Sequence, residues 1–183
     1  MTTVKDILDF FEDFAPAATA MDFDNVGLLV GDGGAAVTKA LLTLDITAEA
    51  AEEAAALGCE LIISHHPVIF RPLRALRTRD AAYVLARHGM AAVCMHTNLD
   101  LSERFGVNTC LAAAQEGADV LVTGEIKHHE INAANELGVN IVDAGHFKSE
   151  DVVLAPLRKK LEAAFPEVRF VKSRTYSDKI KYI

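Results

Sequence analysis

The chain has 183 residues, 51% of them hydrophobic, and a formal net charge of −8 at pH 7. This length and composition suffice for a sizeable core in one compact domain or two small lobes. No apolar run reaches the roughly 18 residues of a membrane span, and the negative charge disfavours nucleic-acid binding, which requires a clustered basic face.

Helical and extended patterns alternate along the chain. The opening Met1–Asp6 is typical of an amphipathic helix reaching Phe14 and not of a signal peptide. The alternation predicts an α/β fold with a helix-covered, largely parallel or mixed sheet. Strands are predicted at 26–30, 40–44, 60–64, 91–95, 119–122, 139–142 and 167–171, and further helices at 47–57, 78–88, 107–116, 127–137 and 149–165, the last capped by Ser149.

The three cysteines, Cys59, Cys94 and Cys110, are scattered in or beside apolar segments and form no C-x-x-C motif. They indicate reduced core thiols and a cytoplasmic location.

An internal similarity predicts how the domain is organised. The stretch 58–66 resembles 117–125, and each leads through a helix, a glycine and a second strand to a histidine, His96 or His146. We expect one metal-binding domain over 1–183 made of two related half-units, approximately 1–110 and 111–183, that share a cleft. Convergent strand–helix–strand organisation would explain the same similarity.

Two adjacent histidines, His65 and His66, end the apolar run Leu61–Ser64. Neighbouring side chains of an extended chain point to opposite faces, so a core cannot use both rings, whereas two adjacent metal ions can take one each. Pro67 stops the strand and holds the pair at its exit. The alternative is one buried, hydrogen-bonded histidine beside an exposed one.

Six of the seven histidines lie close to the end of a predicted strand, and only His88 does not. Functional sites of α/β folds assemble at the carboxyl ends of strands, so this bias favours a polynuclear metal site. Imidazole and carboxylate ligands suit two divalent ions such as zinc, iron, manganese or nickel, with bridging oxygens between them. The predicted ligands are His65, His66, Asp100, His146 and Glu150.

Two of these ligands have simpler explanations when taken singly. Glu150 can be a helix N-terminal acid, and Asp100 can belong to an Asx turn. His96 is a sixth ligand, a proton-transfer group or a residue that orients a ligand, and we expect His96 and Glu150 to be catalytic. Glu125 and His129 are further candidates for these roles. Arg71, Arg74, Arg77 and Arg79 form a solvated face or attract an anionic substrate, and Asp24 belongs to a turn or reaches the rim of the cleft.

Five stretches resemble the NIF-three-like dinuclear metal-centre family, also known as GTP cyclohydrolase type 2 homologues. They are Asp24–Gly31, Ile62–Pro67, His96–Asp100, Thr123–His129 and Gly145–Glu150, and they extend over almost the whole chain. The resemblance implies the same five metal ligands, a small-molecule or nucleotide substrate, and GTP ring opening as the reaction. It also implies an α/β subunit that assembles through dimers into a toroidal hexamer.

The middle of the chain departs from that family. Its members carry several dozen further residues before the strand predicted at 119–122, whereas here Leu111–Gly117 is predicted to form one continuous helix. Phe23 replaces the family's usual tryptophan.

Two functions follow from these observations. The first is a metal-dependent hydrolase acting through a bridging hydroxide, although no P-loop is present to indicate a nucleotide. The second is a non-catalytic metal-binding protein, such as a metal chaperone, a reservoir or an assembly scaffold. Metal exchange distinguishes them, because a chaperone releases its ions readily and an enzyme retains them during turnover.

Overall fold

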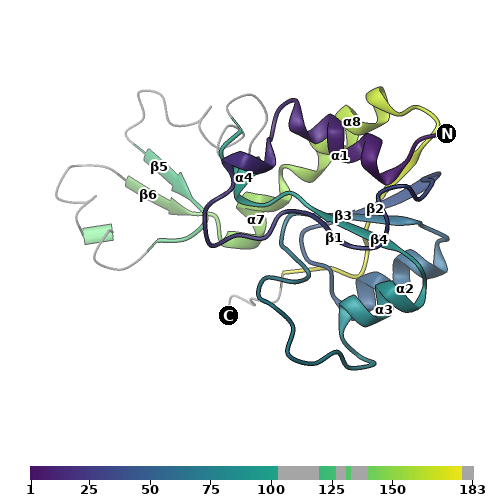
Figure 1. Cartoon of the computed structure of the whole chain (residues 1–183). Helices are drawn as coiled ribbons and strands as arrows, with labels where there is room; N and C mark the ends of the chain where they lie inside the picture. The colour runs from purple at the N-terminus through teal and green to yellow at the C-terminus, as the bar shows by residue number, and fades with distance from the viewer. Residues whose placement is uncertain (103–119, 127–130, 133–139, 179–183) are drawn as a thin grey trace.

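The computed structural model describes residues 1–102, 120–126, 131–132 and 140–178 and has the predicted α/β fold (Figure 1). The predicted helices at 107–116 and 111–117, Cys110 and His129 lie outside the described residues. The helices are α1 Val4–Glu12, α2 Ala48–Ala56, α3 Ala81–Arg87, α4 Thr97–Asp100, α7 His146–Asp151 and α8 Leu154–Ala164, with a 3-10 turn at Ala17–Thr19. The strands are β1 Gly27–Val30, β2 Lys39–Thr43, β3 Leu61–Ser64, β4 Ala91–Cys94, β5 Val120–Thr123, β6 Asn140–Asp143 and β7 Arg169–Lys172.

Five strands form the main sheet in the order β1-β4-β3-β2-β7. All neighbouring pairs are parallel except β1 and β4, which are antiparallel, so the sheet is mixed and mainly parallel. Crossover helices return the chain between parallel strands, which places the carboxyl ends of β2, β3 and β4 at one edge.

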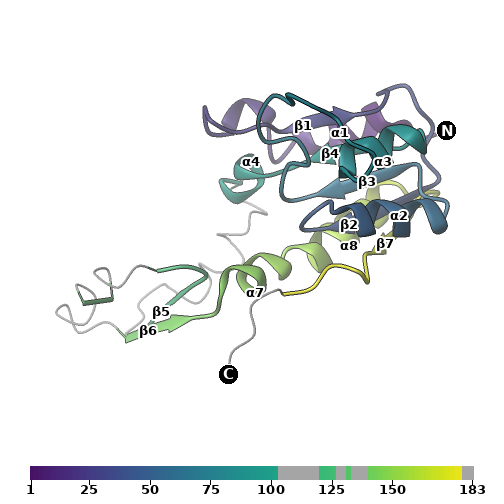
Figure 2. The same cartoon turned by 90° about the horizontal axis from the view of Figure 1, so that it is seen from below.

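Helices cover both faces of this sheet (Figure 2). Alternate strand residues point to opposite faces, which gives two apolar clusters. Leu42, Ile63 and Val93 pack with α1 and α8, whereas Leu41 and Ile62 pack with α2 and α3. Both faces are therefore apolar, and polar side chains are concentrated where the strands end.

The remaining strands, β5 and β6, form a separate parallel pair beyond the end of the main sheet, and α7 follows β6 (Figure 1). The last strand, β7, returns to the main sheet beside β2. The division into half-units near residue 110 stays a prediction. No helix in the described ranges has both the length and the apolar character to cross a bilayer.

The prediction that Ser149 caps the last helix is wrong. Ser149 lies inside α7, which begins at His146 directly after Gly145, a residue with a φ of +76°. The predicted single helix is instead divided at 152–153, between α7 and α8. Pro156 explains the division, because in an uninterrupted helix its ring would clash with the carbonyl of Val152 and leave that carbonyl without an N–H donor.

Candidate metal centre

Three parallel strands deliver side chains to one edge of the sheet. Thr43, Ser64 and Cys94 are aligned across β2, β3 and β4. The residues that directly follow these strand ends, including Asp45 and the His65–His66 pair, therefore lie side by side.

The backbone of the His65–His66 pair is fixed on both sides. The His66 N–H donates to the Leu44 carbonyl at 2.8 Å, and the Ser64 hydroxyl donates to the His66 carbonyl at 2.8 Å. The thiol of Cys94 lies 3.1 Å from the His65 carbonyl oxygen. Burial raises the pKa of that thiol, so it remains protonated and acts as a donor.

Three histidines form a first group of possible metal ligands, His65, His66 and His96, which we call the inner triad. One ring nitrogen from each residue lies within 4.8 Å of the others. The His65 side chain is 1% exposed, and its Nε2 lies 3.0 Å from Oδ1 of Asp100. Its Nδ1 is buried and has no hydrogen-bond partner among the described residues.

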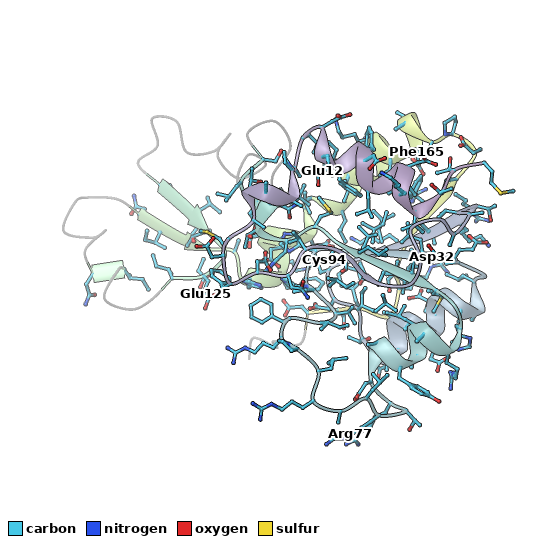
Figure 3. The ribbon with its side chains drawn as sticks, in the orientation of Figure 1. Glu12, Asp32, Arg77, Cys94, Glu125 and Phe165 are labelled. Atoms are coloured by element: carbon cyan, nitrogen blue, oxygen red, sulfur yellow. The ribbon has the colours of Figure 1, made fainter. Side chains whose placement is uncertain are left out.

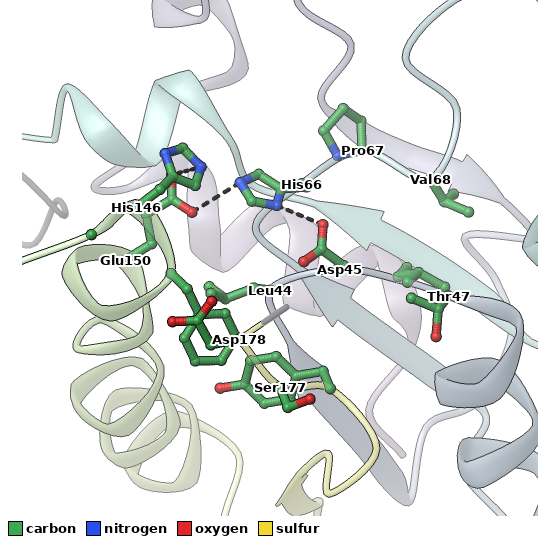
Figure 4. A pocket seen from close by; sticks show the side chains of 14 residues that line it. Leu44, Asp45, Thr47, His66, Pro67, Val68, His146, Glu150, Ser177 and Asp178 are labelled. Atoms are coloured by element: carbon green, nitrogen blue, oxygen red, sulfur yellow. Dashed lines mark hydrogen bonds and ion pairs between the residues drawn. The ribbon is translucent and has the colours of Figure 1, made fainter. Parts of the chain in front are cut away.

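A second group, which we call the outer triad, consists of His66, His146 and Glu150 (Figure 4). His146 and Glu150 lie four residues apart on α7, with His146 Nε2 3.1 Å from Glu150 Oε1. Glu150 Oε2 is buried and lies 3.0 Å from His66 Nε2. The two triads share His66, so one ring links the sheet to α7.

Asp45 is a site residue that the sequence analysis missed. Its Oδ1 lies 2.8 Å from His66 Nδ1, on the side of the ring opposite Glu150 (Figure 4). Burial alone lowers the pKa of His66, but the hydrogen bonds to Asp45 and Glu150 outweigh it and raise this pKa to about 10. The same contact lowers the pKa of Asp45. The signal was present, since Asp45 follows a buried strand just as the histidines do.

Asp24 contacts His96, in agreement with the prediction that Asp24 reaches the site. Its carboxylate is 0% exposed, with Oδ1 2.8 Å from His96 Nδ1. Oδ2 accepts hydrogen bonds from the Thr97 hydroxyl at 2.6 Å and from the Thr97 N–H at 3.1 Å. Burial raises the pKa of Asp24, but these contacts outweigh it, and the pKa lies below its usual value.

The remaining candidates lie at the margin or elsewhere. Glu125 is 83% exposed, and its carboxylate lies 3.7 Å from His146 Nδ1. In Figure 3 it lies beside the β5–β6 pair, on the side toward the main sheet. His88 ends α3 and pairs with Glu52 at 3.2 Å, far from a strand exit, as predicted. All four arginines of the loop after β3 are exposed, and Arg77 projects away from the sheet (Figure 3).

A cavity of about 620 Å³ opens beside the outer triad. His66, His146 and Glu150 form one part of its wall, and apolar side chains such as Val68 and Phe147 form another. The segment after β7 completes it with Tyr176, Ser177 and Asp178 (Figure 4). A cavity of this size accommodates a small molecule next to the candidate ligands.

The donor set fits divalent transition metals. It combines imidazole nitrogens with carboxylate oxygens, and the buried Nδ1 of His65 has no hydrogen-bond partner in the described ranges. Buried polar atoms rarely remain unsatisfied, so Nδ1 of His65 indicates a missing ligand.

A family model described as Duf34/NIF3 (NGG1p interacting factor 3) matches residues 2–114 and 110–179. A Clostridium perfringens protein named "GTP cyclohydrolase 1 type 2 homolog" is 27% identical over 261 aligned positions, which cover 98% of this chain and 99% of that protein. A Staphylococcus aureus protein of the same name is 40% identical over 114 residues, which cover 61% of this chain and 31% of the relative. The 261 aligned positions exceed the 183 residues of this chain, so the relative is the longer of the two.

The fold is also found among solved structures. The crystal structure of Staphylococcus aureus protein SA1388 aligns with a TM-score of 0.87 and 24% identity, covering 100% of this chain and 99% of that one. A Bacillus cereus protein related to NIF3 aligns with a TM-score of 0.82 and 18% identity, covering 100% and 99%.

Proposed function

The chain belongs to the Duf34/NIF3 family, and on this premise we propose that it is a dinuclear metal-dependent hydrolase. The observation that carries the proposal is the pair of triads that share His66. Nε2 of His66 can serve one ion, and the other members of the two groups, together with Asp100, supply further imidazole and carboxylate ligands for a neighbouring ion. Bound zinc, iron, manganese or nickel would supply Lewis acidity and activate water.

The proposed ligands are His65, His66, Asp100, His146 and Glu150. His65 and Asp100 are in contact at 3.0 Å, and His66, His146 and Glu150 form the outer triad. Asp100 and Glu150 contact imidazole rings in the metal-free structure. With ions bound, the same carboxylate oxygens and ring nitrogens would face the ions. Asp45 and Asp24 would orient His66 and His96, as carboxylates commonly orient the histidines of metal sites.

We assign catalytic roles to His96 and Glu150. The His96 ring centroid lies 5.4 Å from that of His65 and 5.5 Å from that of His66, and its side chain is 19% exposed, so solvent and substrate can reach it. With Nδ1 held by Asp24, the other ring nitrogen is available for proton transfer. Glu150 faces both the cavity and the outer triad, where its carboxylate would bind metal and orient water.

The substrate we propose is a small molecule in the cavity beside the outer triad, with a nucleotide as one possibility. The cavity volume of about 620 Å³ suits a ligand of that size. The names of the curated relatives point to GTP ring opening.

Self-association is part of the proposal. Phe23 is 65% exposed and its ring lies 6.4 Å from that of Phe70, while Leu73 and Leu76, on the same loop as Phe70, are about half exposed. Exposed apolar groups of this kind mark interaction sites. Arginines at 71, 74 and 77 alternate with them. We propose a homo-oligomer, with the hexamer of the family as the expected state.

The deciding experiment combines metal analysis with a substrate screen. Protein purified without chelators is analysed for metals, reconstituted with each candidate ion, and assayed against nucleotides, phosphoesters and amides. We expect two ions per chain and turnover that disappears in His66→Gln but not in the control His88→Gln. Protein that binds no transition metal before or after reconstitution would contradict the proposal. Two ions that exchange readily without turnover of any substrate would favour a metal chaperone or reservoir.

A further inference from the structure

The helix that carries half of the outer triad is short and depends on neighbours for its position. α7 has six residues, fewer than an isolated helix needs to be stable in water. It carries His146 and Glu150, whereas His66 comes from the main sheet, so the outer triad exists only while α7 is held against that sheet. The question is which side chains hold it.

We propose that Tyr176, which follows β7, is a positioning residue for the outer triad. This inference rests on the proposed metal binding and deepens it, because it assigns to one side chain the placement of a single group of ligands. Tyr176 also lines the cavity, so it acts where a substrate would enter.

Two contacts join Tyr176 to α7. Its hydroxyl donates to the carboxylate of Asp151, and its ring centroid lies 5.3 Å from that of Phe147. Asp151 directly follows Glu150, and Phe147 directly follows His146. The two contacts therefore fix α7 at the neighbours of its two candidate ligands.

Lys172 strengthens this attachment. Its Nζ lies 2.7 Å from Oδ1 of Asp151 and 5.5 Å from the centre of the Tyr176 ring. Lys172 belongs to β7, which pairs with β2 of the main sheet. Asp151 is thus attached to the sheet both directly, through Lys172, and through Tyr176.

The segment between β7 and Tyr176 is itself anchored to α2. The carboxylate of Glu53 accepts hydrogen bonds from the Ser173 hydroxyl at 2.5 Å, the Arg174 N–H at 2.9 Å and the Thr175 hydroxyl at 3.0 Å. Ser173 also donates its N–H to the Leu42 carbonyl of β2 at 2.8 Å. Tyr176 consequently has a defined position relative to the sheet that carries His66.

The position of the inner triad does not depend on Tyr176 or α7. His65 and His66 follow β3, and His96 follows β4, where Asp24 holds it. The hydrogen bond and ring contacts of Tyr176 are with Asp151, Phe147 and Lys172, and none of these residues belongs to the inner triad. Loss of Tyr176 should therefore weaken one ion and spare the other, whereas a purely structural role would weaken both together.

The test measures metal binding to Tyr176→Phe and Tyr176→Ala, with Tyr83→Phe of α3 as the matched control. Each protein is titrated with Co²⁺ and followed by visible absorption, and affinities for Zn²⁺ are measured by calorimetry. We expect two ions in the wild type, one of them bound about tenfold more weakly in Tyr176→Phe and more weakly still in Tyr176→Ala. Binding of the second ion should stay unchanged in Tyr176→Phe, and loss of one hydrogen bond should lower the melting temperature of the metal-free protein by only about 2–4 °C.

Equal weakening of both ions, or no weakening of either, would overturn the inference. Hydrogen exchange of the metal-free proteins supplies a second readout that does not depend on metal. We expect the amides of residues 146–151 to exchange faster in Tyr176→Ala while those of β3 and β4 do not, and unchanged exchange in α7 would also overturn the inference. Wild-type protein without metal affinity would contradict the proposed function, but the exchange result would still decide the role of Tyr176.

Discussion

Nδ1 of His66 lies 2.8 Å from Oδ1 of Asp45, which fixes the orientation of the one ring that both triads share. A carboxylate on the far nitrogen leaves Nε2 facing the ligand groups and makes the ring a better donor to a metal. Asp45 therefore acts on the ion that His66 would bind.

Asp45→Asn should weaken metal binding about 10–100-fold, because the amide orients the ring less strongly and adds no negative charge. The pKa of His66 in the metal-free protein should fall from about 10, since the contact that raises it is lost. Calorimetry gives the affinity, and NMR titration of the imidazole protons gives the pKa. Asp9→Asn, in an exposed pair with Lys5, is the control and should change neither quantity.

Gly124→Ala should displace α7. A Cβ at position 124 would lie 2.9 Å from the Cβ of Ser149, closer than such atoms approach in proteins. We expect the free energy of unfolding to fall by about 1–3 kcal/mol and the ion at the outer triad to bind more weakly. Adding Ser149→Gly should restore binding, and a double-mutant cycle with each single variant measures the coupling. If the double variant binds no better than Gly124→Ala, the contact is not the cause.

The contribution of Glu53 to stability should depend on pH. Burial raises the pKa of Glu53, but hydrogen bonds from residues 173–175 outweigh it and lower the pKa below 4.5. A lowered pKa in the folded state stabilises the protein above pH 4.5, and this stability is lost as the pH falls through the folded-state value.

Glu53→Gln should accordingly lose about 1 kcal/mol at neutral pH and progressively less in acid. Urea unfolding at several pH values measures the difference from wild type. Glu162→Gln, in an exposed pair with Arg158, should show little effect at any pH. A Glu53→Gln difference that does not shrink in acid would refute this assignment.

Leu73→Ser combined with Leu76→Ser should reduce the size of the assembly. Both side chains are about half exposed on the loop after β3, and apolar area buried between subunits contributes about 25 cal/mol per Å². Light scattering after size exclusion reports the oligomeric state. Leu57→Ser, at an exposed position after α2, is the control that should leave the assembly intact.

The sequence predicted the parts of the fold that depend on local pattern. Apolar runs followed by polar residues identified the strands and the exits that carry His65, His66 and His96. The partners of these histidines were harder to find, because Asp24 resembles an ordinary turn residue and meets His96 only through tertiary structure. The α7–α8 boundary was not predicted from the helical pattern, because that pattern continues across 152–153 and only Pro156 interrupts the hydrogen bonding of the preceding turn.

The pairing of β7 with β2 has a consequence for biosynthesis. It joins residues 39–42 to residues 169–172, a contact of very high sequence separation, and such contacts form late in folding. The inner triad is encoded entirely before residue 97, whereas α7 and β7, the strand that anchors it, are synthesised later. The outer triad therefore cannot assemble before residues 146–172 have been synthesised, whereas all three histidines of the inner triad are present once residue 96 has been added.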